Sequence, residues 1–353
     1  MQVNKLNKTL GVIGAGQLGK MIGLAAANLG INCYFYDPDK NAPAKNISKL
    51  FYNYSFNNEK RLIEFAKKCD FITYEFENIP INTLQKISKY KKIYPSIKAL
   101  QVSQDRFIEK NFIKSLGVKV ADFVNIESFS DIKENLKDSF KKGILKTRRL
   151  GYDGKGQTLL ELKSLDNLKL KIRPNAYILE KYVPFKKEIS VIAIREKSGK
   201  IKTFEPTQNI HKAGILRETI YPANISKKCI LKAKNIAKKI TKELNITGLL
   251  AIEMFILNDE NILVNEIAPR PHNSGHWTTD ACNISQFDAL VRSIFSIPIP
   301  QITYTKNCKM INLLGDNFYS YKKHLNKKNS QVYIYGKTSV KPSRKMGHIN
   351  III

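Results

Sequence analysis

The first hundred residues alternate short apolar runs with a longer stretch of helical periodicity. Apolar runs at 10–14, 32–36 and 71–76 predict buried strands, and the apolar residues of 17–29 recur at the spacing of an amphipathic helix. Strands that alternate with helices at this interval are typical of a parallel sheet covered by helices. We therefore expect a parallel-sheet domain over residues 1–98.

The pattern changes after residue 98, where short strands outnumber helices. A helical repeat over 103–116 precedes a block of short strands at 118–183, which we interpret as a lid. The last break in pattern lies at Pro298 and Pro300. The chain is therefore expected to divide into an N-terminal domain at 1–98, a central domain at 99–297 that contains the lid, and a small β-rich C-terminal domain at 298–353.

A glycine-rich loop within the expected lid is the strongest chemical signal in the chain. The apolar strand at 143–146 ends in Lys146, and the loop Gly151-Tyr152-Asp153-Gly154-Lys155-Gly156-Gln157 follows shortly after. Glycines let backbone N–H groups approach an anion closely, and the lysines neutralise its charge. The next element is a strand and the P-loop spacing is absent, so the loop predicts an ATP site of another class.

A second glycine motif lies between the first strand and the first helix. The segment Gly14-Ala15-Gly16-Gln17-Leu18-Gly19, with Asp37 at the end of the second strand, matches the dinucleotide-binding fingerprint. An NAD-dependent oxidoreductase is therefore one alternative. Nothing downstream supplies a site for hydride transfer, so we favour a turn that binds a substrate phosphate, while close helix–sheet packing would also explain the glycines.

Two glutamates lie on the strands of a predicted hairpin. Glu253 and Glu266 are each flanked by apolar residues, and a carboxylate in such surroundings is costly unless it is paired or binds a metal. With Asn265 beside them, these oxygen donors suit Mg²⁺, which binds one or two carboxylates together with substrate phosphates. Either glutamate alone would be interpreted as a charge facing solvent, but the pair favours a metal site.

The segment 268–277 concentrates polar chemistry after the second glutamate. Arg270 could clamp a transferred phosphoryl group. A zinc site at His272 and His276 is disfavoured, because their spacing falls in a Pro/Gly loop and not on a helix. Elsewhere the chain offers weaker candidates for nucleotide contacts, each of which alone could have a surface or capping role: Glu180, Lys181, Tyr182, Val183, Glu188 and His211.

Composition narrows the class of protein. The net charge of +29 raises the alternative of a nucleic-acid-binding protein, but the lysines are spread along all 353 residues and form no basic tail. No apolar run is long enough for a spanning helix or for a leader at the start of the chain. The five scattered cysteines suggest reduced thiols, so we expect a cytoplasmic protein with neither nucleic-acid nor membrane partners.

Together these motifs resemble the ATP-grasp superfamily and, more closely, the family of N5-carboxyaminoimidazole ribonucleotide synthetases. The resemblance is carried by the segments 73–80, 104–106, 146–157, 265–277 and 344–348. It implies a mixed α/β and α+β structure, an ATP-grasp fold with an N-terminal Rossmann-like domain, a central lid and a β-rich C-terminal domain. The activity it implies is carboxylation of 5-aminoimidazole ribonucleotide with ATP and bicarbonate, through carboxyphosphate, in purine biosynthesis.

The resemblance also implies roles for individual residues. Catalytic groups would be Lys146, Arg270 and Asp153, the last handling a proton, and two Mg²⁺ ions would bind Glu253 and Glu266. ATP would contact Arg106, Lys146, Gly151, Tyr152, Asp153, Gly154, Lys155, Gly156, Gln157, Glu180, Lys181, Tyr182, Val183, Glu188, His211, Asn265 and Glu266. The ribonucleotide would contact Gly16, Gln17, Leu18, Glu75, Asp153, Arg270, His272, Asn273, Ser274, Gly275, Lys337, Arg344 and Lys345.

Some features of the chain depart from the family pattern or leave alternatives open. The family usually has glycine where Leu150 stands, which predicts a stiffer lid, and glutamate where Gln208 stands. Other ATP-grasp ligases, such as a formate-dependent ribonucleotide transformylase or a biotin carboxylase, remain alternatives. A homodimer is expected from the family alone.

Overall fold

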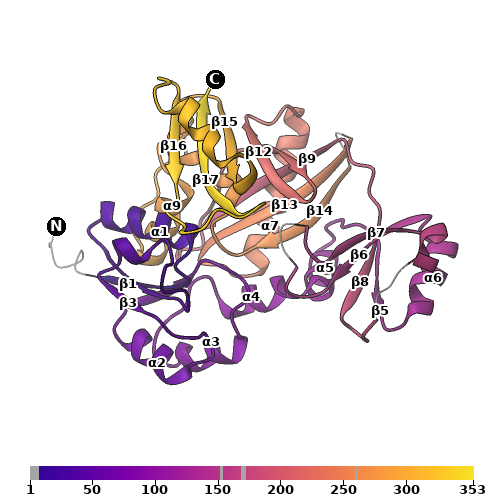
Figure 1. The fold of residues 1–353 in the computed structure, drawn as a ribbon, viewed down its shortest axis with the longest axis horizontal. Coiled ribbons are helices and arrows are strands. Elements are labelled where there is room, and N and C mark those ends of the chain that lie inside the picture. The colour runs from indigo at the N-terminus through magenta and orange to yellow at the C-terminus, as the bar shows by residue number, and fades with distance from the viewer. Residues whose placement is uncertain (1–7, 152–153, 168–171, 259–260) are drawn as a thin grey trace.

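The computed structural model describes residues 8–151, 154–167, 172–258 and 261–353 and has three units (Figure 1). The N-terminal unit is a parallel sheet in the order β3-β2-β1-β4, as the alternating pattern predicted. The three-residue strand β3 lies below the length that periodicity detects. The elements of the N-terminal unit are β1 (Thr9–Ile13), β2 (Asn32–Tyr36), β3 (Leu50–Tyr52), β4 (Phe71–Tyr74), α1 (Gln17–Asn28), α2 (Glu59–Lys67) and α3 (Ile81–Ser88).

The central unit is built on a nine-stranded sheet that continues into the C-terminal unit. Strand β12 pairs with β15, so the C-terminal strands extend the central sheet in the order β14-β13-β9-β11-β12-β15-β17-β16, with β10 beside β9. Its strands are β9 (Lys187–Arg195), β10 (Ile201–Thr203), β11 (Thr207–Lys212), β12 (Ile215–Tyr221), β13 (Gly248–Asn258), β14 (Asn261–Ala268), β15 (Cys308–Leu314), β16 (Ser330–Ile334) and β17 (Lys345–Ile352).

Helices cover this sheet and connect it to the neighbouring units. The helix predicted over 103–116 is observed at Arg106–Ser115, because Asp105 accepts hydrogen bonds from the N–H groups of Phe107 and Ile108 and so begins the helix there; Ser103 ends a separate, preceding helix. Helix α9 was not predicted, although Ser285 and Asp288 form a capping box at its start. The helices are α4 (Ile97–Ser103), α5 (Arg106–Ser115), α7 (Lys227–Glu243), α8 (Thr278–Ala281) and α9 (Gln286–Phe295).

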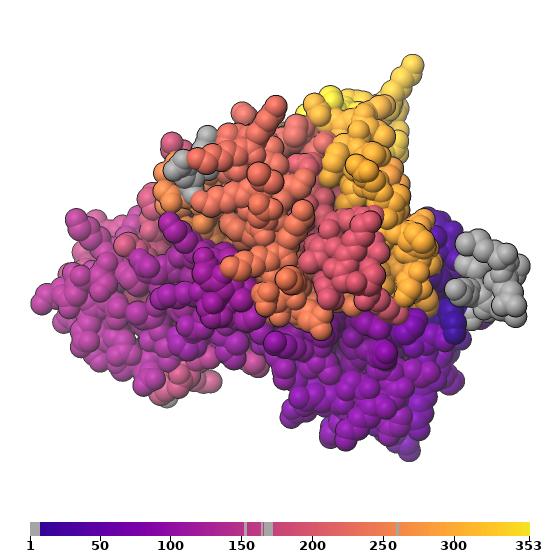
Figure 2. Space-filling model, turned by 180° about the vertical axis from the view of Figure 1, so that it is seen from behind, coloured from indigo at the N-terminus to yellow at the C-terminus, as the bar shows by residue number. Residues whose placement is uncertain are grey.

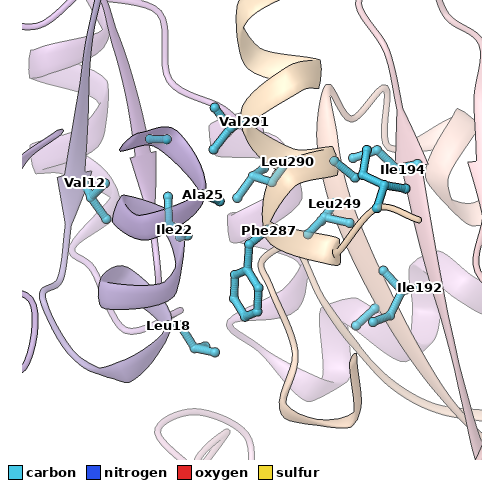
Figure 3. Close-up of a cluster of buried hydrophobic side chains, with 14 of the residues drawn as sticks. Val12, Leu18, Ile22, Ala25, Ile192, Ile194, Leu249, Phe287, Leu290 and Val291 are labelled. Atoms are coloured by element: carbon cyan, nitrogen blue, oxygen red, sulfur yellow. The ribbon is translucent and has the colours of Figure 1, made fainter. Parts of the chain in front are cut away.

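Helix α9 joins the N-terminal unit to the central sheet (Figure 3). One side of it packs against α1 through Leu290 and Val291, which meet Ile22 and Ala25. The other side covers β9 and β13 near Leu249. Each fully buried aliphatic side chain contributes about 1.5–3 kcal/mol. This shared core therefore fixes the first glycine turn relative to the hairpin that carries the two glutamates.

The lid is a separate lobe at one end of the molecule (Figures 1 and 2). Its antiparallel sheet has the order β5-β8-β6-β7, and its own small core includes Ile132, Leu145 and Leu179. None of the described helices is both long and apolar enough to cross a membrane. The lid contains β5 (Phe123–Ile126), β6 (Lys142–Thr147), β7 (Gln157–Glu161), β8 (Tyr177–Lys181) and α6 (Phe129–Asp138).

Candidate active site

A cavity of about 1140 Å³ lies where the lid, the central sheet and the two terminal units meet. Most of the residues singled out from the sequence line it. Tyr152 and Asp153 lie outside the described residues. The predicted residues that line the cavity are Gln17, Leu18, Glu75, Arg106, Lys146, Gly151, Gly154, Lys155, Gln157, Glu180, Lys181, Tyr182, Val183, Glu188, His211, Glu253, Asn265, Glu266, Arg270, His272, Asn273, Lys337, Arg344 and Lys345.

Four predicted contact residues do not line the cavity: Gly16, Gly156, Ser274 and Gly275. Gly16 lies behind the Glu75 carboxylate. Ser274 is fully buried, and Gly275 lies so close to neighbouring side chains that an added Cβ would clash. Ser274 and Gly275 are therefore buried behind the cavity lining, while the ligand contacts of Gly16 and Gly156 stay predictions.

Lys146 is buried beside Glu180 at the lid end of the cavity. Its Nζ donates to Glu180 Oε2 at 2.8 Å, and Lys110 Nζ lies 3.2 Å from the same oxygen. Burial lowers the pKa of Lys146, although Glu180 opposes the shift. Glu180 Oε1 is buried without a hydrogen-bond partner among the described residues. Such an orphaned acceptor suits a ligand that brings an N–H group, as a nucleotide base does.

Lys110 and its neighbour Glu109 were missed by the sequence analysis. Lys110 is fully buried and Glu109 is 1% exposed, and burial raises the pKa of Glu109 to about 8. Both lie in α5, whose helical repeat predicts one buried face. Hydrophobic periodicity identifies only the apolar residues of a buried face. It therefore could not show that these two charged residues are buried as well.

The two glutamates of the hairpin are direct cross-strand neighbours. Glu253 on β13 is registered opposite Glu266 on β14. Burial and the charge of Glu266 raise the pKa of Glu253 to about 7. Burial alone would raise the pKa of Glu266 too, but Arg106, at 2.9 Å from Oε2, lowers it. Asn265 Oδ1 is buried without a hydrogen-bond partner among the described residues, so these residues form an oxygen donor set that fits Mg²⁺.

Glu188 and His211 form a close pair on adjacent strands of the central sheet. Nδ1 of His211 lies 2.5 Å from Glu188 Oε2. Burial acts to lower the pKa of His211, but the hydrogen bond with Glu188 and nearby carboxylates raise it overall. This pair lines the same cavity as Lys146, as the order of the motifs in the chain suggested.

The glycine turn of the N-terminal unit holds a carboxylate of the protein itself. Glu75, at the end of β4, accepts hydrogen bonds from the N–H groups of Gly16 and Gly19, the latter at 2.5 Å. Asp37 accepts the N–H of Ala15 at 2.7 Å and so braces the same turn. A dinucleotide pyrophosphate would need the N–H groups that Glu75 occupies. The turn therefore resembles the NAD fingerprint without its function, and the substrate phosphate that we favoured there is replaced by Glu75.

Burial makes Glu75 a source of pH-dependent stability. Desolvation raises its pKa from 4.5 to about 7. Between these values the folded protein binds more protons than the unfolded chain, so the free energy of unfolding falls as pH rises through this window. In the wild-type protein, Glu75 should lower the free energy of unfolding by roughly 2–3 kcal/mol between pH 5 and pH 8, as measured by urea unfolding. We expect this part of the pH dependence to be absent in Glu75→Gln. An unchanged slope in the variant would contradict the assignment.

The base of the lid loop is tied to the start of α5. Arg148 forms a bidentate ion pair with Asp105, with its nitrogens 2.9 and 3.0 Å from the carboxylate oxygens. Beyond it, Gly154 has a φ of +75° and lies so close to the turn between β11 and β12 that an added Cβ would be 2.8 Å from Ala213 O. Only glycine fits this close approach to the central sheet.

Leu150 stands at the entrance of this loop in a conformation that favours glycine. Its φ is +63° and its side chain is 71% exposed. A left-handed backbone costs a residue with a Cβ about 1–2 kcal/mol. We therefore expect Leu150→Gly to be about 1 kcal/mol more stable than Leu150→Ala in urea unfolding. At an ordinary φ the alanine variant would be the more stable of the two, because glycine makes the unfolded chain more flexible. A more stable alanine variant would therefore exclude backbone strain at position 150.

Arg270 and His272 bring the segment after β14 into the cavity. Arg270 pairs with Glu77, with its Nε and Nη2 each 3.1 Å from a carboxylate oxygen. Glu77 was missed because only its contact with Arg270, 193 residues away, gives it a role. His272 Nε2 lies 3.5 Å from Glu253 Oε1, and burial lowers its pKa. In this structure the predicted clamp is therefore paired with a carboxylate of the protein.

His276 does not line the cavity. It is fully buried, and its ring stacks on His348 with centroids 4.6 Å apart. Within the described ranges, no three His, Cys, Asp or Glu side chains are grouped to hold a metal ion. Two carboxylates suffice for Mg²⁺ when phosphates complete its coordination. The zinc interpretation of His272 and His276 has no support in this geometry.

Cations from the C-terminal unit also line the cavity. Lys337, Arg344 and Lys345 all line it, and Arg344 Nη1 donates to Ser339 O at 3.0 Å and to Ser339 Oγ at 2.7 Å. The loop that carries Lys337 is held by Lys20, whose Nζ donates to Tyr335 O at 3.2 Å. Three cations in one wall favour an anionic ligand such as a phosphate.

Comparison with known proteins agrees with this geometry. Three family models match the chain: an ATP-grasp domain over 111–287, a ribonucleotide synthetase preATP-grasp domain over 7–104 and a phosphoribosylaminoimidazole carboxylase C-terminal domain over 308–353. The chain is 39% identical to the N5-carboxyaminoimidazole ribonucleotide synthase of Brucella melitensis, in an alignment that covers 99% of this chain and 97% of the relative.

Solved structures show the same likeness. The N5-carboxyaminoimidazole synthetase of Staphylococcus aureus, complexed with ADP, has a TM-score of 0.90 and 35% identity, covering 99% of this chain and 95% of that one. The synthase of Aspergillus clavatus, in complex with ADP and 5-aminoimidazole ribonucleotide, has a TM-score of 0.89 and 29% identity, covering 99% and 94%.

Proposed function

The chain belongs to the N5-carboxyaminoimidazole ribonucleotide synthase family of ATP-grasp proteins, and we propose that it carboxylates 5-aminoimidazole ribonucleotide with ATP and bicarbonate in purine biosynthesis. Relatives of this chain carry that name, and the Aspergillus clavatus enzyme binds ADP and the ribonucleotide together. The activity makes the protein a ligase that forms a C–N bond.

One observation carries the proposal: a single cavity holds the groups for two anionic substrates. Lys146 and the two hairpin glutamates line it and would bind ATP and its metal. Arg344 and Lys345 line it too and would neutralise a 5′-phosphate. A dinucleotide enzyme needs free N–H groups in its glycine turn, and in this chain Glu75 accepts their hydrogen bonds. A shared cavity allows a reactive intermediate to form beside its acceptor without exposure to water.

The chemistry follows in two steps. A bicarbonate oxygen attacks the γ-phosphorus of ATP, and ADP leaves as carboxyphosphate forms. The exocyclic amine of the ribonucleotide then attacks the carboxyl carbon, or CO₂ released from it, and inorganic phosphate departs. Lys146, Arg106 and Arg270 would offset the charge on the transferring phosphoryl group. The proton lost by the amine is assigned to Asp153 from the sequence alone.

The donor set at the hairpin supports a role for Mg²⁺. Glu253, Glu266 and the unpartnered Asn265 Oδ1 would hold it. When bound, the metal would act as a Lewis acid that withdraws charge from the phosphate oxygens. The second Mg²⁺ ion, the homodimer and the cytoplasmic location stay predictions from the sequence.

A measurement of ADP release tests the proposed activity. Purified protein with Mg-ATP and bicarbonate should release ADP faster when 5-aminoimidazole ribonucleotide is added. Replacing bicarbonate with formate, or the ribonucleotide with biotin, should abolish the stimulation. A response to formate would identify a transformylase, and a response to biotin would identify a biotin carboxylase. Either response, or no stimulation at all, would reject the proposal.

A further inference from the structure

A row of polar side chains crosses three strands of the central sheet beneath His272. Ser190 on β9 is registered directly opposite Thr207 on β11 and also opposite Glu253 on β13. Direct cross-strand partners project from the same face of a sheet. The row therefore presents hydroxyl groups next to a carboxylate, and the segment after β14 lies over it with Ser274 and His272.

Hydrogen bonds connect the hydroxyl part of this row to His272. Ser274 Oγ lies 2.8 Å from His272 Nδ1, and Ser190 Oγ lies 2.7 Å from Ser274 Oγ. Thr207 Oγ1 is 3.0 Å from Ser190 Oγ. Ser274 is fully buried, while Ser190 and Thr207 are each 2% exposed. None of the three hydroxyls can therefore serve as a nucleophile toward a substrate.

The donors in this chain fix where the proton of His272 lies. The backbone N–H of Ser274 points at His272 Nδ1 from 3.3 Å, and a backbone N–H can only donate. Nδ1 is therefore an acceptor, and the ring proton is on Nε2. Each hydroxyl has one proton to give, so the chain runs one way: Thr207 donates to Ser190, Ser190 to Ser274, and Ser274 to Nδ1.

We propose that Ser274 and Ser190 are positioning residues that hold His272 with its Nε2–H directed at Glu253 and the cavity. His272 would then offer a hydrogen-bond donor to the cavity and not a base. The orientation serves the proposed carboxylation, on which its importance for turnover rests. A chain of buried hydroxyls suits this task, because each bond in it polarises and strengthens the next.

The experiment begins with the wild-type protein and reads the tautomer directly. The chain has only five histidines, so ¹⁵N-histidine labelling gives few resonances, and His272→Gln assigns one of them. We expect the ¹⁵N shifts of His272 to show Nε2–H and an unprotonated Nδ1 that accepts a hydrogen bond. A proton on Nδ1 would overturn the proposal without any variant, and this reading does not depend on catalysis.

The variants then test the two serines. Ser274→Ala should displace the Nδ1 resonance and lower kcat by roughly tenfold, with the KM for ATP changed less than about twofold. Ser190→Ala should shift the His272 Nδ1 resonance in the same direction as Ser274→Ala does, but by a smaller amount. The matched control is Ser293→Ala, which removes a buried hydroxyl bonded to Leu290 O and should change neither reading. An unmoved resonance, an unchanged kcat or an effect mainly on KM in Ser274→Ala would overturn the proposal.

Discussion

Replacement of Glu266 by glutamine is expected to lower the ADP release stimulated by 5-aminoimidazole ribonucleotide by roughly 10²–10³-fold. The amide keeps the shape of the side chain and can still accept the hydrogen bond from Arg106 at 2.9 Å. It loses the negative charge that would hold Mg²⁺ beside Glu253. The fold should therefore survive while phosphoryl transfer fails.

The dependence on Mg²⁺ separates this cause from a general loss of structure. In Glu266→Gln the concentration of Mg²⁺ for half-maximal activity should rise by tenfold or more. Glu218→Gln is the matched control, because it removes a half-buried ion pair with Lys309 on the same sheet, away from the cavity lining, and should change neither value. Full activity of Glu266→Gln at the wild-type Mg²⁺ concentration would remove Glu266 from the metal site.

Much of the candidate site could be predicted because its chemistry lies in short segments. The lid loop is recognisable from its glycines and lysines alone. Glu253 and Glu266 could be paired because two strands joined by a short turn must form a hairpin, and a hairpin brings its strands into register. Local sequence therefore predicted these parts of the cavity wall.

The glycine turn shows why other parts could not be predicted. Gly14–Gly19 follows the dinucleotide fingerprint in its glycine spacing, and the sequence around it has the expected strand and helix. Its function is decided by which anion reaches the N–H groups. Here that anion is Glu75, which lies 59 residues from Gly16 along the chain. No local pattern encodes such a contact, so the turn was assigned to a phosphate.

Ser274 was misassigned for a related reason. It lies in a segment dense with polar residues, and such segments often contact ligands. The sequence does not show which of their side chains face the cavity and which face the sheet below. The partner that decides this is Ser190, which lies 84 residues away. Polar residues of one loop can therefore divide between contacts with a ligand and support for their neighbours.

Replacement of Lys110 by methionine is expected to cost roughly 3 kcal/mol of the free energy of unfolding. Lys110 is fully buried, with Nζ 3.2 Å from Glu180 Oε2 and 3.2 Å from Asn265 O. Methionine fills the space but leaves the buried Glu180 carboxylate dependent on Lys146, whose Nζ lies 2.8 Å from Oε2. Removing one partner of a buried ion pair is costly because the other charge stays desolvated.

Urea unfolding measures this loss, and the same helix supplies its control. Lys114→Met lies one turn further along α5 at an exposed position and should change the free energy of unfolding by less than about 0.5 kcal/mol. If Lys110→Met were as stable as Lys114→Met, Lys146 alone would be enough to compensate Glu180. A large difference would make α5 a structural part of the nucleotide site, because Lys110 would then hold in place the carboxylate that positions Lys146.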